Sequence, residues 1–452
     1  MATSSPHIMI IGAGTGGLCL AQALKRAGVS VTVYERDRTR MDGLFGYRVG
    51  ISPNGSQALR ACLPPELFDT FLATTAITPR YFNILTERMT ELFSMSEEMD
   101  SGKIEVADQE HSVSRMTLRQ VLMTGLEDAV HFGKKFTRYE RHHNGSVTAF
   151  FDDDTSDTAD VLVGADGTSS PVRRQYLPDA RLEETDLFGV TGKLPLTEET
   201  RKLLPAKMLR GVSMISAPHG YSTIIHAMEF PWDHDGTVKG DIGGNDTELL
   251  KAWAGLNFDN TRDYIMWGFG AHRRYLPEDF MRQDGSTLHR IVLDRTTKWH
   301  PNLRKLFQLA DPTTCFPINI RTSVPLDPWP TSSVTLIGDA IHTMTPGLGV
   351  GANTALRDAQ ILGRNLIAAH QGRTSVLEAI ADYEKQMHGY AWRAVVKSRE
   401  RFSGDSATYK PVIGRLVLAG MRTGMWVANH LPPLKRKIAA TQVAERGHDR
   451  AA

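Results

Sequence analysis

Residues His7–Arg36 read HIMIIGAGTGGLCLAQALKRAGVSVTVYER. An apolar strand runs into the glycine turn Gly12-x-Gly14-x-x-Gly17, which is followed by a helix and by a second strand that ends at Glu35. Strand, glycine turn, helix and second strand in this order predict a parallel β-α-β unit, the building block of the dinucleotide-binding fold.

Each glycine of this turn has a physical role in that fold. Gly12 makes the tight turn, Gly14 lets the backbone approach a pyrophosphate, and Gly17 lets the helix pack closely on the strand. Glu35 lies at the spacing where an acid accepts hydrogen bonds from ribose hydroxyls. We therefore predict dinucleotide binding, the alternative being a turn that is merely tight. Two neighbouring residues are further cofactor-binding candidates, Thr15 and Arg36.

A second turn occurs near the other end of the chain, in Val334–Asn353, which reads VTLIGDAIHTMTPGLGVGAN. A buried apolar strand is expected to end at Gly338-Asp339, and a loop rich in proline and glycine then opens a new helix. Exposed N–H groups at a helix start attract the negative end of a ligand. The carboxylate of Asp339 is placed at the strand tip, where it can accept a hydrogen bond from a hydroxyl group.

A third turn lies between these two, in Asp160–Arg174, with the sequence DVLVGADGTSSPVRR. A short buried strand is followed by a turn and by Ser170-Pro171, which is a typical helix start because a serine cap precedes a proline in the first helical position. Asp166 is a cofactor-binding candidate. The alternative is that Asp166 and Arg173 form a purely structural capping pair.

Composition is that of an ordinary enzyme with two or three domains. The chain has 452 residues and a net charge of +1, which gives no reason to expect nucleic acid as a partner. Its three cysteines (Cys19, Cys62 and Cys315) are widely spaced, which favours a reducing compartment and no metal site. The amino terminus does not resemble a secretory signal, and no run reaches the length of a membrane span, so a cytoplasmic protein is expected.

The three turns, in this order, resemble the motifs of the class A FAD-dependent aromatic hydroxylases, the para-hydroxybenzoate hydroxylase-like flavoprotein monooxygenases. GxGxxG is Gly12–Gly17, and DGxxSxVR is Asp166–Arg173. GDAAHxxxPxxGxGxN is matched by Gly338–Asn353, with Ile341 replacing the second alanine. Arg115 in SRMTLRQVL is similar to the arginine that begins the family's R-x-x-L-x-x-x-L helix and contacts the cofactor.

The resemblance implies an α/β protein with a Rossmann-like FAD-binding domain, an inserted antiparallel β-sheet substrate domain and a C-terminal helical segment. We place the discontinuous FAD-binding domain at 1–70, 111–180 and 291–370. The substrate domain would comprise 71–110 and 181–290, and the helical region 371–452.

The resemblance also implies how the last motif contacts the flavin. Asp339 would hold the ribitol or pyrophosphate region, and Pro346 would lie close to the isoalloxazine ring. The helix start would place its positive end at the flavin N1–C2 edge, where a reduced flavin is negatively charged. The candidates at this helix start are Gly349, Gly351, Ala352 and Asn353. His342 belongs to the motif, and we interpret it as structural rather than as a catalytic base.

The segment Gly43–Leu59 departs from the common family pattern, because Tyr47 and Arg48 replace small residues. Arg48 is a candidate for cofactor or substrate contact, and the alternative is a solvated loop arginine. His226 is the most useful polar group for orienting a phenol, although a core histidine is the simpler interpretation. Arg48 and His226 are the only catalytic candidates, both weak. The pocket-lining candidates, each of which could equally be sheet core, are Met214, His226, Met228, Trp267, Phe269 and Arg321.

With only one GxGxxG turn in the chain, NAD(P)H would visit transiently and reduce the FAD. The resemblance then implies that O2 adds to the flavin C4a carbon, and that the hydroperoxide transfers one oxygen atom to an aromatic or polyketide-like small molecule, in secondary metabolism. Baeyer–Villiger oxygenation, epoxidation and a non-oxygenating FAD reductase or oxidase remain alternatives. The W-x-W-x-I-P motif of flavin-dependent halogenases is absent from the sequence. We expect a monomer or a homodimer.

The sequence beyond about residue 375 has a helical pattern. Its last part, PVIGRLVLAGMRTGMWVANHLPPLKRKIAA, combines apolar residues with a basic end. Such a segment could contact a membrane surface or a partner. Packing of its apolar stripe on the parent domain is the interpretation we favour.

Overall fold

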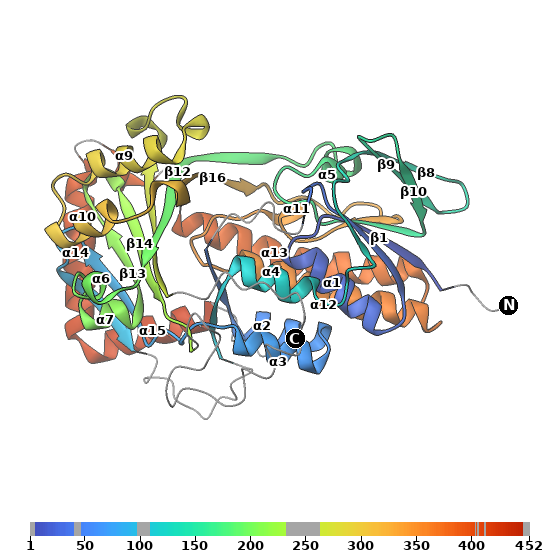
Figure 1. Cartoon of the computed structure of the whole chain (residues 1–452), viewed down its shortest axis with the longest axis horizontal. Helices are drawn as coiled ribbons and strands as arrows, with labels where there is room; N and C mark the ends of the chain where they lie inside the picture. The colour runs from blue at the N-terminus through green and yellow to red at the C-terminus, as the bar shows by residue number, and fades with distance from the viewer. Residues whose placement is uncertain are drawn as a thin grey trace.

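The computed structural model describes residues 5–39, 47–96, 109–231, 263–402, 404, 406–410 and 413–445. The chain forms two units that lie side by side, each built on its own β-sheet (Figure 1). Three segments named in the predictions lie outside the described residues, namely 43–46, 97–108 and 232–262.

The first unit contains a five-stranded sheet in which all neighbouring strands are parallel. In spatial order its strands are β17 (Val334–Leu336), β11 (Val161–Gly164), β1 (His7–Ile11), β2 (Ser30–Tyr34) and β7 (Val130–His131). β17, β11 and β1 are almost fully buried, as continuous apolar runs in a parallel sheet should be, whereas β2 is buried only at its carboxyl end. Because parallel strands end at the same edge, the three predicted turns meet there, with Ile11 paired to Gly164 and Gly164 to Leu336.

Helices cover this sheet and share its core. They are α1 (Thr15–Arg26), α2 (Pro53–Cys62), α3 (Pro65–Ala73), α4 (Arg115–Met123), α5 (Pro171–Tyr176), α11 (Asp339–His342), α12 (Gly351–His370) and α13 (Val376–Arg401). A separate antiparallel sheet consists of β8 (Phe136–Arg141), β9 (Val147–Phe151) and β10 (Ser156–Ala159), and a two-stranded ribbon of β3 (Arg48–Ile51) and β6 (His111–Ser114).

The second unit contains a seven-stranded sheet. In spatial order its strands are β16 (Phe316–Ser323), β12 (Leu182–Pro195), β15 (Tyr264–His272), β14 (Ser222–Met228), β13 (Gly211–Ser216), β4 (Tyr81–Thr86) and β5 (Glu91–Ser96). All neighbours are antiparallel except β4 and β13, which are parallel. The inserted antiparallel sheet that the family resemblance implies is therefore present, with one parallel pair.

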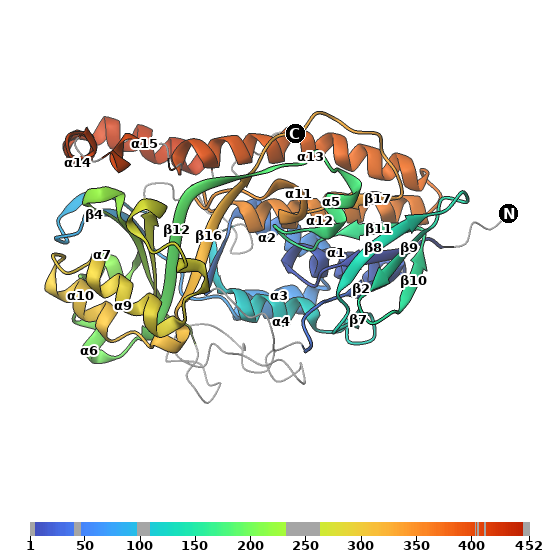
Figure 2. The ribbon, with the colours of Figure 1, turned by 90° about the horizontal axis from the view of Figure 1, so that it is seen from above.

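Alternation along these strands separates two faces. One face packs on α9 (Gly285–Arg295) and α10 (Pro301–Gln308) and carries Trp267 and Phe269. The other face carries Met228, which packs in a small cluster that includes Tyr47 beside the β3–β6 ribbon. This second face therefore looks toward the first unit, and Figure 2 shows the two sheets side by side from above. The remaining helices are α6 (Glu198–Arg201), α7 (Ala206–Leu209), α14 (Ile413–His430) and α15 (Pro432–Glu445).

The packing differs from the predicted segment boundaries at two places. The prediction assigned 291–370 to the FAD-binding domain, but β16 pairs with β12 and α10 packs under the seven-stranded sheet. Within the predicted C-terminal helical region, α13 contributes Tyr383 and Trp392 to the core of the first unit, whereas α14 packs on β5. Helical periodicity identifies these elements correctly but does not say which sheet they cover.

Candidate functional site

The Gly12–Gly17 turn has the geometry that a pyrophosphate requires. Gly12 has φ 110°, and a side chain there would lie 2.4 Å from the carbonyl oxygen of Ala165. A Cβ atom on Gly17 would lie 2.2 Å from the carbonyl oxygen of Gly12, so the close approach of helix to strand needs glycine. A Cβ atom on Gly14 would meet nothing nearer than 4.0 Å, which leaves space for a ligand beside the backbone. Gly12 and Gly17 therefore make the tight turn and the close helix–strand contact, and the contact of Gly14 with a pyrophosphate stays a prediction.

Glu35 lies at the end of β2, directly beside this turn. Its Oε2 accepts a hydrogen bond from the backbone N–H of Ala13 (2.7 Å), and its Oε1 accepts one from Asp37 (3.0 Å). Since a carboxylate has about four acceptor positions, further positions remain for the hydroxyls of a ribose. Arg36, by contrast, points to solvent, and Thr15 is the first residue of α1.

Arg119 is a residue of this site that the sequence analysis missed. Its Nε donates to the carbonyl oxygen of Ala13 (3.1 Å), and its Nη2 lies 3.1 Å from Asp37 and 3.7 Å from Glu35. Arg119 lies four residues after Arg115, on the same face of α4. That spacing was the available signal, but the partners of Arg119 are distant in sequence.

Asp166 and Arg173 connect the second turn to the third. Oδ2 of Asp166 accepts from the N–H of Val172 at the start of α5 (3.2 Å), while its Oδ1 is buried without a hydrogen-bond partner. Burial raises the pKa of Asp166. Arg173 donates to the carbonyl oxygens of Ala340 and Thr168, both at 2.8 Å. Arg173 is thus structural, whereas the free oxygen of Asp166 leaves room for a ligand contact.

Asp339 and Arg115 lie close enough for their charges to interact. Both side chains are exposed, yet burial among the surrounding protein raises the pKa of Asp339, and the charges of His342 and Arg115 oppose that rise. An exposed carboxylate at such depth lines an internal recess rather than the outer surface. The N–H of Arg115 also donates to the carbonyl oxygen of Tyr47 (2.7 Å), which fixes the start of α4 next to β3.

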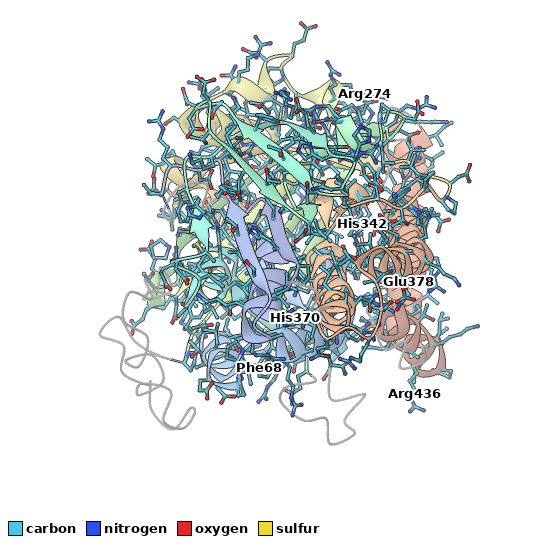
Figure 3. All side chains as sticks on the ribbon, turned by 90° about the vertical axis from the view of Figure 1, so that its right-hand side faces the viewer. Phe68, Arg274, His342, His370, Glu378 and Arg436 are labelled. Atoms are coloured by element: carbon cyan, nitrogen blue, oxygen red, sulfur yellow. The ribbon has the colours of Figure 1, made fainter. Side chains whose placement is uncertain are left out.

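A buried hydrogen-bond network holds the segment from Gly338 to His342 in place. Asp358 of α12, which is fully buried, accepts hydrogen bonds from the N–H of Gly338 (2.7 Å), from Nε2 of His342 (2.6 Å) and from the hydroxyl of Tyr390. Burial alone would lower the pKa of His342, but the carboxylate of Asp358 outweighs it and raises the pKa. His342 is also fully buried and lies in the interior (Figure 3), which agrees with the structural interpretation.

The start of α12 carries no capping side chain, and Gly349 before it has φ 68°. Its N-terminal end is therefore free of a side-chain acceptor, as a site for a flavin edge requires. The side chain of Asn353 is used elsewhere: its Nδ2 donates to Gly50 and its Oδ1 accepts from Ser52, both at 2.9 Å. Pro346 and Gly349 are exposed, and Gly351 and Ala352 are half-buried.

Arg48 and His226, the two catalytic candidates, come close together between the units. Nε of Arg48 donates to the hydroxyl of Ser112 (2.9 Å), and its Nη2 lies 3.5 Å from Glu110. His226 is 1% exposed and its Nδ1 has no hydrogen-bond partner. Burial, and then the charge of Arg48, lower the pKa of His226 well below 6.5. His226 is therefore neutral at physiological pH.

The other pocket-lining candidates separate by strand face. Met228 packs beside Tyr264 and Met266 on the face toward the first unit. Trp267 and Phe269 lie on the opposite face, in the core under α9 and α10, so they are sheet core. Met214 is 36% exposed, and Arg321 forms an ion pair with Glu184 (2.8 Å). Met214 is paired with Ile224 and therefore shares the sheet face of Met228, whereas Arg321 remains a candidate without further support.

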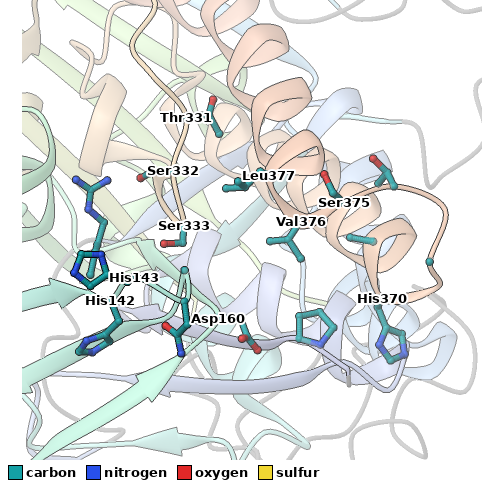
Figure 4. A pocket seen from close by; sticks show the side chains of 17 residues that line it. His142, His143, Asp160, Thr331, Ser332, Ser333, His370, Ser375, Val376 and Leu377 are labelled. Carbon is teal, nitrogen blue, oxygen red and sulfur yellow. The ribbon is translucent and has the colours of Figure 1, made fainter. Parts of the chain in front are cut away.

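A large surface pocket lies at the opposite edge of the parallel sheet (Figure 4). Its volume is about 840 Å³, and it is lined by Pro6, Asp160 and Ser333, which directly precede β1, β11 and β17. The glycine turns lie at the other ends of these strands. This pocket is therefore separate from the candidate cofactor site. Within the described residues no cluster of His, Cys, Asp or Glu has the arrangement of a metal site, and no helix is long and apolar enough to cross a membrane.

Comparison with known proteins agrees with this geometry. A family model described as an FAD-binding domain matches residues 6–398. A dual O-methyltransferase/FAD-dependent monooxygenase, CTB3 of Cercospora beticola, is 33% identical over 433 residues, which cover 89% of this chain and 47% of that protein. An FAD-dependent urate hydroxylase of Klebsiella pneumoniae is 28% identical over 395 residues, covering 87% of this chain and 88% of the relative.

Solved structures show the same architecture. The crystal structure of a protein described as an FAD-containing monooxygenase from Photorhabdus luminescens has a TM-score of 0.73 and 33% identity, and covers 88% of this chain and 98% of that one. The chain binds FAD and belongs to the family of FAD-dependent, hydroxylase-like flavoprotein monooxygenases. It spans about half the length of the first curated relatives that it matches.

Proposed function

We propose that this protein is a monooxygenase that uses FAD and NAD(P)H to insert one oxygen atom from O2 into an aromatic small molecule. One observation carries the proposal. Arg115, Asp339 and the uncapped start of α12 converge at one edge of the parallel sheet, and His226 lies on the sheet face that looks toward them. That arrangement provides a cofactor site and, across from it, a surface for a second ligand.

The residues present fit FAD along its whole length. The backbone of Gly12–Gly17 would hold the pyrophosphate, and Glu35 would bind the adenosine ribose. Arg119 would hold the glycine turn and Glu35 in position. Asp339 would bind hydroxyls of the ribitol, and the positive end of α12 would stabilise charge on the flavin ring. The bound FAD would supply reduction by NAD(P)H and activation of O2 at its C4a carbon.

On the substrate side, the chain contributes position and exclusion of water. The sheet face toward the first unit is apolar around His226, with Met228, Tyr264 and Met266 in one cluster. Nδ1 of His226 is buried and unpartnered, so a neighbouring side chain would have to move aside before a phenol hydroxyl could hydrogen-bond to it; in such surroundings that single bond would orient the phenol strongly. Arg48, held by Glu110 and Ser112, would stabilise negative charge that develops on the phenol oxygen.

The fungal relatives favour a phenolic product. Their names pair an O-methyltransferase with an FAD-dependent monooxygenase in one protein. A hydroxyl group placed on an aromatic ring is a substrate for O-methyl transfer, so the two activities fit consecutive steps on one molecule. We therefore place the reaction in the secondary metabolism of an aromatic, polyketide-like compound.

Turnover with a panel of phenols and aromatic polyketides tests the proposal. NADPH and NADH consumption is followed with and without each compound, and products are weighed by mass spectrometry. Consumption stimulated by substrate and a product one oxygen atom heavier, labelled from 18O2, are expected. Consumption that yields only hydrogen peroxide across the panel, or a reduced product without oxygen, would instead favour an FAD oxidase or reductase.

The substrate-side roles have their own test. Arg48→Ala should keep FAD content and lower the coupling of NAD(P)H consumption to product by about tenfold or more, and Arg48→Lys should restore part of it. Arg138→Ala is the matched control, because that arginine pairs with Glu140 on β8, in the small antiparallel sheet away from the cluster. If Arg48→Ala retains normal reduction and coupling, the proposed role is wrong.

A further inference from the structure

The helices α14 and α15 form a surface that the flavin site does not use. α14 packs one side on the edge strand β5: Asn429 accepts a hydrogen bond from the N–H of Ser94 (3.2 Å), and Arg422 pairs with Glu87. The sequence favours packing of the apolar stripe on the parent domain, and this prediction is wrong for the stripe itself: α14 packs on β5 through its other face, and the apolar stripe is exposed. The contact with β5 accounts for only one face of the helix, on which Leu418 is also buried.

The opposite face of α14 is an exposed apolar stripe. Ile413, Leu416, Val427 and Leu431 follow at helical spacing, and their exposed fractions are 54%, 73%, 38% and 49%. Gly420 and Gly424 lie between them on the same face, and a side chain on either would meet nothing within 4 Å. Trp426 is 50% exposed, with its ring on His430, and Leu434 continues the apolar surface onto α15. Large apolar side chains are rarely left open in such a row without a partner.

The charge around this stripe has a single sign. The sequence contains no aspartate or glutamate from Pro411 to Ala444, and it contains Arg415, Arg422 and the run Lys435-Arg436-Lys437. Arg415, Arg436 and Lys437 are exposed, and Figure 3 labels Arg436 at the outer edge of the molecule. Figure 2 shows α14 and α15 along the same flank of the molecule as α13.

We propose that α14 and α15 dock this protein on an anionic lipid surface. The apolar stripe would enter the boundary of headgroups and acyl chains, Trp426 would lie at the interface, and the basic residues would contact lipid phosphates. The helices lie in the plane of the surface and do not cross it.

The charge of this surface favours an anionic membrane over a second copy of the chain. In a twofold dimer the same patch meets itself, so the basic residues of one copy (Arg415, Arg436 and Lys437) would face the basic residues of the other. No carboxylate of the segment is available to neutralise them. An anionic membrane supplies apolar contact and the opposite charge together, which a self-association does not.

Co-sedimentation of the full-length, FAD-loaded protein with lipid vesicles tests the proposal. The probes are vesicles of phosphatidylcholine alone and vesicles of phosphatidylcholine with phosphatidylserine. We expect binding to the phosphatidylserine vesicles that weakens as salt is raised, and little binding to phosphatidylcholine.

Two variants assign the binding to this surface. Leu416→Glu should lower the partition coefficient about tenfold or more, because it removes a leucine that the membrane would bury and adds a negative charge. The double variant Arg436→Glu, Lys437→Glu should lower it similarly and reduce its salt dependence. Leu377→Glu is the matched control, since Leu377 is 53% exposed on α13 and away from the stripe.

FAD absorbance and circular dichroism verify that each variant is folded, and light scattering measures the mass in solution. Equal binding of all variants, or no binding to phosphatidylserine vesicles, would overturn the proposal. A dimer that becomes a monomer in Leu416→Glu, without vesicle binding, would show that a second copy covers the stripe. NAD(P)H consumption should not change in Leu416→Glu, so the outcome does not depend on the proposed reaction.

Discussion

Replacing Asp358 with asparagine should destabilise the first unit by about 2–3 kcal/mol. The carboxylate accepts three hydrogen bonds in a fully buried position, from Gly338, His342 and Tyr390. A hydrogen bond to a charged acceptor contributes about 1.5–3 kcal/mol, against about 0.5–1.5 kcal/mol for a neutral one. Each of the three hydrogen bonds therefore loses about 1 kcal/mol. Because a neutral amide costs less to bury than a carboxylate, part of this loss is offset.

The amide group of the introduced asparagine can replace the carboxylate in only one orientation. Gly338 and His342 both donate to Oδ2 of Asp358, so the asparagine oxygen must take that position, and its NH2 group then faces the hydroxyl of Tyr390. That hydroxyl can rotate to accept, which is why we expect a folded protein. Asp358→Leu, by contrast, leaves three buried donors unpaired at about 1–3 kcal/mol each, comparable to the whole stability of a domain.

Urea unfolding of the apoprotein, followed by tryptophan fluorescence, measures the change. Trp392 lies in the affected core and contributes to the signal, together with Trp267 and Trp299 of the second unit. Asp294→Asn, an exposed carboxylate on α9, is the control and should remain within 0.5 kcal/mol of the wild type, as expected of surface substitutions. FAD affinity should also fall in Asp358→Asn, because Gly338 precedes Asp339. An Asp358→Asn protein as stable as the control would refute the reasoning.

Three further outcomes are expected. Gly17→Ala should be purified without FAD, measured by absorbance, because its Cβ would lie 2.2 Å from the carbonyl oxygen of Gly12; normal flavin content would contradict the geometry. Arg119→Gln should raise the dissociation constant of FAD about tenfold or more in a fluorescence titration, since it loosens the backbone beside Glu35, and an unchanged constant would exclude that role. The pKa of His226 is lowered in the folded protein, so below pH 6.5 the unfolded chain binds a proton that the folded protein does not. The free energy of unfolding therefore decreases as the pH is lowered, by up to about 1.4 kcal/mol per pH unit. His226→Asn should remove this slope in urea unfolding between pH 6.5 and 5, and an unaltered slope would assign it to other groups.

The turns could be predicted from sequence because each is encoded within a few adjacent residues. Gly12 and Gly17 have no steric substitute at their positions, and Ser170-Pro171 specifies a helix start locally. Each turn follows a buried strand, and all three turns are expected to contact one cofactor. The three strands must therefore end at the same edge of the sheet, which makes them parallel. FAD binding follows from that local information together with the family resemblance.

The rest of the site depends on contacts between distant segments, which no local pattern encodes. Arg119 reaches Ala13 across about a hundred residues of sequence, and Asp358 reaches His342 from the next helix. By sequence, Met228 and Trp267 are both pocket candidates; strand pairing places them on opposite faces of the sheet, and only packing reveals which face looks toward the flavin unit. Alternation with a period of two does not say which face of a strand is buried in the core. Residues that line a pocket could therefore not be distinguished from core residues by sequence.

The buried polar groups of α13 have a consequence for how this chain can be divided or fused. Glu384 accepts hydrogen bonds from Trp329, Thr331 and Thr335, and Tyr383 donates to the carbonyl oxygen of Leu336. The strand that presents the last motif is thus held in place by a helix that follows all the motifs. A shortened chain that stops at residue 371 would retain every recognisable signature and still lose the support of its flavin turn. Any additional module must therefore be joined beyond Arg401, or ahead of the first strand, to leave the site intact.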